Sequence, residues 1–326
     1  MQNLPKIFTQ KLEKIFSKEE LEIIYSGYSL KKRQVSFRVN TLKSSNEEIE
    51  SILHKENIKF QKISYLTNGY KLIDGLEKDL WNLDIFTEGK IYLQGITSQF
   101  IGEIVQKDFK NQDLKILDLT ASPGGKTSHI SAIMQNYGEI IANELNTIRI
   151  EKLNFTINRQ GCTNIKVIHG DARNLKNLFP NGYFDLIIAD LPCSAEGRIN
   201  LNNEKSYLFL QKPGINEKNY KIQKDILKNT VDLLKIGGSL IYSTCTIDPR
   251  ENEAIIHFLL SNYKDLVIEE INDIFENENI KKYIKKGIKS FDKYIYNSQV
   301  SKTIRIIPSQ ETEGFFIAKI KKLENL

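Results

Sequence analysis

The chain has 326 residues, of which 40% are hydrophobic and 27% charged, and a formal net charge of +5. This length and composition suit one large folded core, or one core with a small satellite, and they exclude a disordered or fibrous chain. No stretch approaches the ~18 consecutive apolar residues of a membrane span, and the N-terminus mixes charged and apolar residues. We therefore expect a cytoplasmic protein without a membrane anchor, and the mild basicity is only a weak indication of nucleic-acid binding.

Residues 1–88 are predicted to form a small α+β domain. From Pro5 to Tyr28 the apolar residues recur every three or four positions, which predicts two short amphipathic helices. Ser45 is a suitable N-cap for a helix over residues 46–56, and the segments around this helix are typical of strands. The predicted strands are residues 35–42, 59–66 and 69–73.

Residues 89–326 are predicted to form an α/β domain. A turn-rich stretch over residues 84–95 separates the two domains, and a helix over residues 98–109 follows it. Apolar strands then alternate with helices, a pattern that demands a parallel sheet. The predicted strands are residues 114–120, 139–145, 165–171, 184–192 and 239–245, and the helices between and after them are residues 127–136, 147–159, 216–235 and 249–260. Residues 303–308 and 314–322 are typical of a closing antiparallel pair.

A glycine-rich loop, DLTASPGGK at residues 118–126, follows the first strand of this domain. A P-loop would require glycine at position 120, which is Thr, and no GxGxxG motif follows the strand, so neither usual phosphate loop fits. Acidic residues end three successive strands, namely Asp118, Glu144 and Asp171. The second could accept hydrogen bonds from both hydroxyls of a ribose, and the third could meet the exocyclic amine of an adenine. Together they are compatible with S-adenosylmethionine as the cofactor.

Three cysteines are present, and they form no CxxC pair or His/Cys cluster, so we expect no disulfide framework, no metal and a reducing compartment. Cys162 lies in a turn and is expected to be a buried hydrophobe. Cys193 and Cys245 both follow apolar strands, and two thiols at the edge of a sheet suggest covalent attack on an electrophilic ring. A thiolate that adds to C6 of cytosine makes C5 able to take a methyl group from a sulfonium donor. The adduct must then lose the C5 proton and expel the thiol.

These motifs, in this order, resemble the RNA cytosine C5 methyltransferases of the Nop2/Sun group. The matching segments are FRVNTLK, GKIYLQGITSQF, DLTASPGGKT, NEL, GDA, DLPCSAEG, LKIGGSLIYSTCT, ENE and GFFIAKI. They run from about residue 35 to the C-terminus, and the pairing of PCS with STC is highly specific. The resemblance implies a Rossmann-like class I methyltransferase sheet beside a smaller N-terminal RNA-binding domain. It also implies an RNA (cytosine-C5)-methyltransferase that acts on ribosomal or transfer RNA, and we expect the protein to be a monomer.

By this resemblance, Cys245 would be the nucleophile on C6, and Cys193 would assist release of the methylated RNA. Asp190 would face both the cytosine and the methyl donor, and Lys126 would orient the base from the other side. A carboxylate at position 190 could accept a hydrogen bond from the N4 amine of cytosine. The residues implied in holding the cofactor are Thr120, Ala121, Ser122, Pro123, Gly124, Gly125, Lys126, Glu144, Asp171 and Asp190.

The motifs disfavour other classes of methyltransferase. Methyltransferases that act on exocyclic amines carry (D/N)PP(Y/F) at the fourth strand, where this chain has DLPC. DNA cytosine enzymes would use Cys193 as the nucleophile and would leave Cys245 unexplained, so the second cysteine favours RNA. The group usually has Cys and Ala where this chain has Thr120 and Ser122. These two departures are the support for the alternative of a catalytically silent RNA-binding or ribosome assembly factor, against which both thiols argue.

Basic residues at two places are candidate contacts with RNA phosphates. Lys31, Lys32 and Arg33 precede the first strand, and Arg38 lies within it. Lys281, Lys282, Lys285, Lys286, Lys289 and Lys293 would form one basic face if residues 280–294 were helical, with Tyr283 and Tyr294 able to stack on bases. A last local expectation is that Asp248 caps the helix after Cys245, with Glu251 completing a capping box.

Overall fold

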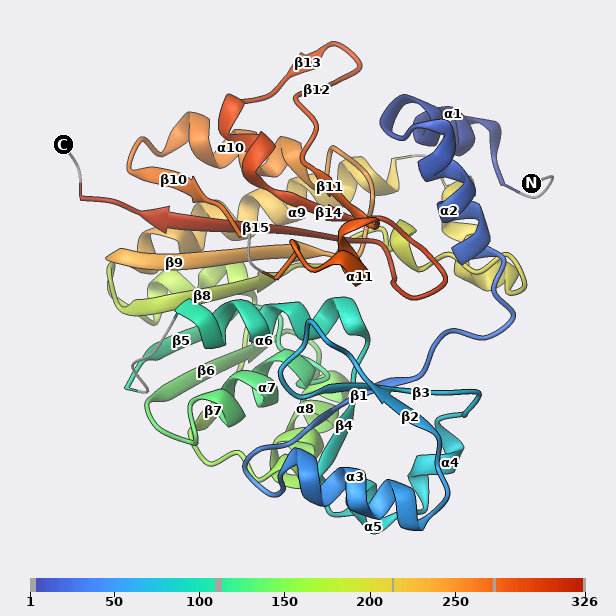
Figure 1. Ribbon diagram of the computed structural model, residues 1–326. Helices are drawn as coiled ribbons and strands as arrows, with labels where there is room; N and C mark the ends of the chain where they lie inside the picture. The colour runs from blue at the N-terminus through green and yellow to red at the C-terminus, as the bar shows by residue number, and fades with distance from the viewer. Residues whose placement is uncertain (1–3, 109–112, 213, 272–273, 325–326) are drawn as a thin grey trace. The chain divides into compact units, whose positions relative to one another are not determined.

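The computed structural model describes residues 4–108, 113–212, 214–271 and 274–324 of the chain (Figure 1). The chain divides into two compact units, each made of discontinuous segments. Unit 1 consists of Met1–Arg33, Leu175–Tyr183 and Ala189–Leu326, and unit 2 consists of Gln34–Asn174 and Phe184–Ile188. Strand β8 (Phe184–Asp190) therefore contributes residues to both units. Because these units do not divide the chain at a single point, the domain boundary near residue 88 stays a prediction.

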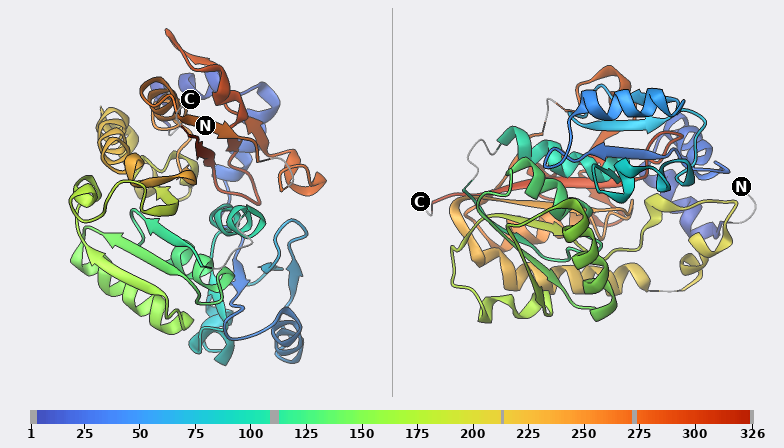
Figure 2. Two further views of the ribbon diagram at one scale, coloured as in Figure 1. Left: turned by 90° about the vertical axis from the view of Figure 1, so that its left-hand side faces the viewer. Right: turned by 90° about the horizontal axis from the view of Figure 1, so that it is seen from below.

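The first part of unit 2 is a four-stranded antiparallel sheet in the order β2-β3-β1-β4. Its strands are β1 (Ser36–Val39), β2 (Phe60–Lys62), β3 (Gly69–Leu72) and β4 (Ile91–Leu93). Helix α3 (Asn46–Lys55) lies along one face of this sheet (Figures 1 and 2). The Ser45 side chain accepts a hydrogen bond from the backbone N–H of Glu48, as the predicted N-cap should. Burial of Phe37, Tyr70, Ile49 and Leu53 in one apolar cluster joins the helix to the sheet.

The predicted turn-rich stretch over residues 84–95 was wrong in part. It contains the short helix α5 (Asp84–Thr87) and strand β4, and helix α4 (Lys78–Trp81) precedes it. Ile91 is fully buried and pairs with Val39 of β1, so tertiary burial makes a strand of a segment too short to show a clear alternation.

The second part of unit 2 is parallel. Strands β5 (Lys115–Asp118), β6 (Glu139–Glu144) and β7 (Ile165–His169) lie in the order β8-β5-β6-β7, and each neighbouring pair is parallel. Along the chain, helix α6 (Ile96–Asp108) precedes β5, α7 (Gly125–Ile133) joins β5 to β6, and α8 (Thr147–Gln160) joins β6 to β7. Phe109, the last residue of the helix predicted over 98–109, lies outside the described residues. The alternation of strand and helix along the chain confirms the predicted α/β fold class.

Unit 1 contains the antiparallel strands of the C-terminal half. Their order is β11-β14-β15-β9, and β10 pairs with β15 on a branch. The strands are β9 (Leu234–Thr244), β10 (Leu266–Glu269), β11 (Ile284–Lys286), β14 (Ile304–Ile306) and β15 (Phe315–Lys322). The helices are α1 (Lys6–Ile15), α2 (Lys18–Tyr28), α9 (Ile215–Thr230), α10 (Glu253–Asn262) and the short α11 (Glu278–Lys281). The predicted closing pair, β14 with β15, and the two N-terminal helices are confirmed.

Residues 280–294 do not form the helix that a single basic face of lysines would require. After α11 the segment forms β11 and then a two-stranded hairpin of β12 (Ser290–Phe291) and β13 (Tyr294–Ile295). Between β11 and the hairpin, Gly287 donates its N–H to the carbonyl of Thr303, and a Cβ atom there would lie 2.4 Å from the carbonyl oxygen of Val300, so this close approach requires glycine. Tyr283 is buried, whereas Tyr294 is exposed, and Lys285 is paired with Glu20. The lysines of this segment therefore do not share one helical face.

The expected capping box at Asp248 was also wrong. Helix α10 begins at Glu253, five residues later. The Asp248 carboxylate instead accepts from the backbone N–H of Arg250, which forms a turn, and the Glu251 carboxylate accepts from the N–H of Ser194. A local turn at Asp248 and a long-range bond from Ser194 to Glu251 therefore replace the expected capping contacts, and Ser194 is the residue after Cys193.

Candidate active site

The two candidate catalytic thiols lie side by side in unit 1. The Sγ atoms of Cys193 and Cys245 are 3.4 Å apart, and both cysteines are reduced and half-buried. Cys193 follows the end of β8, and Cys245 follows the end of β9. Two backbone hydrogen bonds join these strand ends: Leu191 donates to the Ser243 carbonyl, and Gly197 donates to the Cys245 carbonyl. Cys162, in contrast, is buried in an apolar cluster of unit 2, as expected.

The contact between the sulfurs makes the two thiols unequal. A hydrogen bond from Cys193 lowers the pKa of Cys245 below its usual value, although burial opposes this shift. The same hydrogen bond, together with burial, raises the pKa of Cys193 well above its usual value. The positive charge of Arg198 also favours the thiolate of Cys245. Loss of a proton from this pair is therefore favoured at Cys245 over Cys193.

Asp190 lies at the end of β8, three residues before Cys193, and its carboxylate is held by a neighbouring strand. The Ser243 hydroxyl, two residues before Cys245, donates to Oδ1 of Asp190 over 2.8 Å. The negative charge of Asp190 acts on Cys245 and opposes the lowering of its pKa. Cys193, Cys245 and Asp190 are thus brought together within unit 1.

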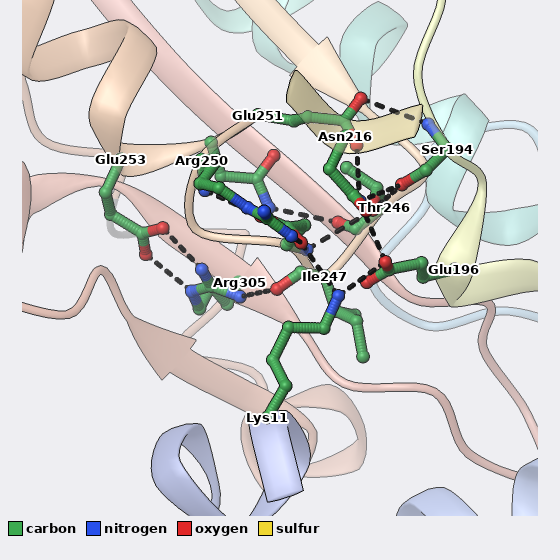
Figure 3. Close-up of polar contacts among 12 residues, drawn as sticks. Lys11, Ser194, Glu196, Asn216, Thr246, Ile247, Arg250, Glu251, Glu253 and Arg305 are labelled. Carbon is green, nitrogen blue, oxygen red and sulfur yellow. Dashed lines mark hydrogen bonds and ion pairs between the residues drawn. The ribbon is translucent and has the colours of Figure 1, made fainter. Parts of the chain in front are cut away.

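A cluster of buried polar side chains, which the sequence did not predict, is formed by residues of the segments that follow the two cysteines and of two helices (Figure 3). Its carboxylates belong to Glu196, Asp248 and Glu251, and all three side chains are fully buried. The amide of Asn216 donates to both Glu196 and Glu251, and Lys11 of α1 forms ion pairs with Glu196 and Asp248. We call these five residues the carboxylate cluster. The ENE motif and the acid at position 196 were visible in the sequence, but nothing local could indicate that Lys11 reaches them.

The glycine-rich loop belongs to unit 2 and joins β5 to α7. Asp118 at the end of β5 is buried and accepts a hydrogen bond from the Thr127 hydroxyl over 2.7 Å. The loop then closes a turn in which Gly124, with a φ of +101°, donates to the carbonyl of Ala121. Only glycine adopts this φ readily, and a Cβ atom would also lie 3.0 Å from the Leu153 side chain. The loop therefore presents backbone groups at the N-terminus of α7, where Lys126 is the second residue.

Glu144 at the end of β6 is 3% exposed. Its Oε1 accepts from the N–H of Asn146, whereas its Oε2 has no hydrogen-bond partner, although Arg149 Nε lies 3.4 Å away. A buried carboxylate oxygen without a donor is costly unless a further hydrogen-bond donor approaches it. Hydroxyl groups such as those of a ribose would meet this need, so this residue fits the predicted cofactor.

Asp171, the third predicted strand-end acid, lies two residues after β7. Its carboxylate accepts from the backbone N–H and the guanidinium of Arg173, and these hydrogen bonds lower its pKa. Ser122, one of the departures from the family pattern, uses its hydroxyl to bond the Arg149 carbonyl over 2.8 Å. The guanidinium of Arg149 donates in return to the Ser122 carbonyl, so the loop and the start of α8 are joined by two hydrogen bonds.

Arg38 does not fit its predicted contact with RNA. It is fully buried and donates to the side chains of Gln94 and Ser128, so it joins β1 to α7 within unit 2. Arg33 also has partners in the protein, since it pairs with Glu313 and donates to the Arg198 carbonyl. Among the described residues, no helix is long and apolar enough to cross a membrane, and no group of three or more His, Cys, Asp or Glu side chains could hold a metal ion.

Solved structures share this fold. A methyltransferase homologue from Pyrococcus horikoshii is 26% identical to this chain, with a TM-score of 0.80 over 98% of this chain and 96% of its own. NSun6 from the same organism, solved with SFG, is 24% identical, with a TM-score of 0.78 over 99% of each chain. The fold is accordingly that of a Rossmann-like class I methyltransferase.

Sequence comparison identifies the family. Residues 106–321, more than half of the chain, match the 16S rRNA methyltransferase RsmB/F family, and the chain belongs to it. The ribosomal RNA small subunit methyltransferase F of Shewanella amazonensis is 32% identical over 302 residues, or 91% of this chain and 59% of the relative. That of Aliivibrio salmonicida is 32% identical over 291 residues, or 88% of this chain and 57% of the relative. The chain thus spans less than two thirds of the length of these relatives.

Proposed function

We propose that this chain methylates C5 of a cytosine in ribosomal RNA, with S-adenosylmethionine as the methyl donor and a covalent bond between Cys245 and C6 of the base. The observation that carries this proposal is the pair of half-buried thiols 3.4 Å apart, whose pKa values are shifted in opposite directions. A structural cysteine has no need of this asymmetry. A nucleophile that must be ionised, next to a thiol that must keep its proton, does need it.

The chemistry follows from these residues. The thiolate of Cys245 adds to C6 of the cytosine and forms an S–C6 bond, which makes C5 electron-rich enough to accept a methyl group. Asp190 is suited to accept a hydrogen bond from the N4 amine of the base and to share a proton with N3, which would stabilise the adduct. Solvent water then accepts the C5 proton, and the electron pair of the broken C5–H bond re-forms the C5=C6 double bond and expels the sulfur of Cys245 as a thiolate. Cys193 can assist this release by donating its S–H to the returning sulfur.

The cofactor would be held by residues of unit 2. S-adenosylmethionine supplies a methyl group on a positively charged sulfur. Glu144 would accept from the ribose hydroxyls, and the orphaned Oε2 of this residue supports that role. The turn at Gly124 and Gly125 would let the ligand approach the backbone at the N-terminus of α7, and Lys126 and Asp171 would contribute as the family pattern implies. SFG, found in the NSun6 structure, is an analogue of S-adenosylmethionine.

The choice of ribosomal over transfer RNA rests on the relatives, which are named as methyltransferases of the small ribosomal subunit RNA. The chain would therefore work in the cytoplasm, where ribosomes are assembled. The basic residues that remain exposed, such as Lys31, Lys32, Lys289 and Lys293, are available for phosphate contacts.

Transfer of a tritiated methyl group tests the proposal. Purified protein, labelled S-adenosylmethionine and small-subunit RNA are incubated, and the RNA is digested to nucleosides. We expect the label in 5-methylcytidine with the natural chain and none with Cys245→Ala. Label in another nucleoside, or undiminished transfer by Cys245→Ala, would contradict the proposed mechanism, and no transfer by a folded natural chain would favour the silent assembly factor.

A further inference from the structure

Lys11 links the N-terminal helix α1 to both cysteine segments. Its Nζ lies 2.5 Å from Oε1 of Glu196 and 2.7 Å from Oδ2 of Asp248, although 185 and 237 residues separate it from these acids (Figure 3). Glu196 is the third residue after Cys193, and Asp248 is the third residue after Cys245. One ammonium group therefore ties equivalent positions of the two segments together.

The electrostatics show why this contact matters for geometry. Both carboxylates are fully buried, and the Lys11 side chain is only 10% exposed. Burial by itself lowers the pKa of Lys11, but the attraction of Glu196 and Asp248 outweighs burial and raises it, so Lys11 carries its charge. Asp248 has a second cation in Arg250, whereas no other ion-pair partner of Glu196 occurs among the described residues. Burial raises the pKa of Glu196 above its usual value and Lys11 opposes that rise, so without Lys11 the Glu196 side chain would lose the cation that favours its charged form and links it to Asp248.

The contacts around Glu196 carry this restraint to the cysteines. Gly197, the next residue, donates its N–H to the carbonyl of Cys245 over 3.0 Å. On the other side, the Ser194 hydroxyl bonds that of Thr246 over 2.7 Å, so the residues that follow each cysteine are in contact. These two hydrogen bonds fix the distance between the two sulfurs, because Ser194 directly follows Cys193 and Thr246 directly follows Cys245.

We propose that Lys11 is a positioning residue for the two thiols: by joining Glu196 to Asp248, it holds the segment after Cys193 against the segment after Cys245. The N-terminal helix is then part of the catalytic machinery although it carries no reacting group. This inference rests on the proposed function for its effect on turnover, but its effect on the thiols can be measured without RNA.

The test compares Lys11→Met, which removes the charge, with Lys11→Arg, which restores it. Lys14→Met is the matched control, because Lys14 lies on the same helix and pairs with Asp292 at the surface, where the two side chains are 58% and 49% exposed. The first readout is the pH dependence of iodoacetamide alkylation at Cys245, followed by mass spectrometry of the modified peptide. The second is methyl transfer, measured as separate kcat and KM values for RNA.

We expect Lys11→Met to move the alkylation profile of Cys245 to higher pH, because Cys193 no longer donates to its sulfur. Turnover should fall by about 10²-fold in kcat with an unchanged KM, a loss typical of a reacting group displaced by about 1 Å. Lys11→Arg should recover both readouts, and Lys14→Met should resemble the natural chain. An unchanged alkylation profile in folded Lys11→Met, or no recovery with Lys11→Arg, would overturn the inference.

If Lys11→Met does not fold, the double variant Lys11→Met/Glu196→Gln removes the unpaired buried charge, so the positioning role of Lys11 can still be tested. It still lacks the link to Asp248, so its kcat should remain low, and a kcat equal to that of the natural chain would contradict the inference. A shifted alkylation profile in a protein whose natural form transfers no methyl group would uphold the positioning role and refute the proposed function. Normal methyl transfer by folded Lys11→Met would uphold the proposed function and refute the positioning role of Lys11.

Discussion

Glu251 makes the stability of this protein depend on pH near neutrality. Its carboxylate is fully buried in the carboxylate cluster and accepts from Ser194, Gln223 and Asn216. Burial, with the negative charges of Asp248 and Glu196, raises its pKa to about 7, against the hydrogen bond from Ser194, which lowers it. The folded protein therefore binds this proton more tightly than the unfolded chain does, in which an ordinary glutamate has a pKa of about 4.3.

The sign and size of the effect follow directly. Because the pKa of Glu251 is raised in the folded state, its protonation stabilises the fold fully at pH values below the pKa of the unfolded chain. This contribution is lost as the pH rises through about 7. Each unit of difference corresponds to about 1.4 kcal/mol, so the whole window is worth about 4 kcal/mol for this buried group, of which about 3 kcal/mol is lost between pH 4 and pH 8. Glu251→Gln keeps a carbonyl oxygen for Ser194 and removes the titration.

Urea unfolding at a series of pH values from 4 to 8 measures this contribution, with the exposed Glu278→Gln as the control for loss of a surface charge. Over this range the natural chain should lose about 3 kcal/mol more unfolding free energy than Glu251→Gln, whereas Glu278→Gln should follow the natural chain. Parallel curves for the natural chain and Glu251→Gln would show that Glu251 stays ionised in the fold, and the reasoning would fail.

Two further substitutions test the surroundings of the site. Arg305→Met should lower the free energy of unfolding by about 3–5 kcal/mol in urea, because it leaves the fully buried Glu253 without its ion pair and removes the bond to the carbonyl of Ile247. Adding Glu253→Leu should recover most of that loss, and a double variant as unstable as the single one would contradict the argument. Glu144→Gln should weaken S-adenosylmethionine binding by about tenfold or more in calorimetry, since a hydrogen bond to a charged acceptor is worth ~1.5–3 kcal/mol. The exposed Glu151→Gln on α8 should bind normally, and equal affinities of the two variants would remove Glu144 from the cofactor site.

Most of the strands and helices could be predicted from the sequence because their burial follows local periodicity. The runs that became β5, β6 and β8 are apolar and end at Asp118, Glu144 and Asp190, so their residues indicated both the strands and the polar groups at their ends. Ser45 likewise indicated the start of α3. Here local preference and tertiary structure agree, as they do in most of a well-folded chain.

The errors occurred where distant partners decide the structure. The lysines after residue 280 would share one face only in a helix, but the segment forms β11 and a hairpin, and Gly287 between them donates to the distant carbonyl of Thr303. Asp248 has the residue type and spacing of an N-cap, but its charge is used by Lys11, 237 residues away. Arg38 was a candidate phosphate contact in the sequence. Its burial and its hydrogen bond to Ser128 form only in the folded unit, so no local pattern could indicate them.

The candidate site was predictable to different degrees. Cys193 and Cys245 were found because each follows an apolar strand, and their contact at 3.4 Å agrees with a shared edge. The carboxylate cluster could not be predicted from the sequence. Its residues come from α1, α9 and the loops after β8 and β9, and no sequence spacing connects them. Single-sequence patterns identify groups at strand ends, whereas the network that holds them depends on contacts made only in the folded chain.

The most direct test of the central claim is to trap the bond between Cys245 and RNA. Cys193→Ala is incubated with small-subunit RNA and S-adenosylmethionine, resolved on a denaturing gel, and the complex is digested for mass spectrometry. We expect a stable RNA–protein complex whose digestion leaves a nucleotide on the peptide that contains Cys245, and none with Cys193→Ala/Cys245→Ala. A nucleotide attached to any other residue, or no complex from a Cys193→Ala protein that binds the RNA, would contradict the account.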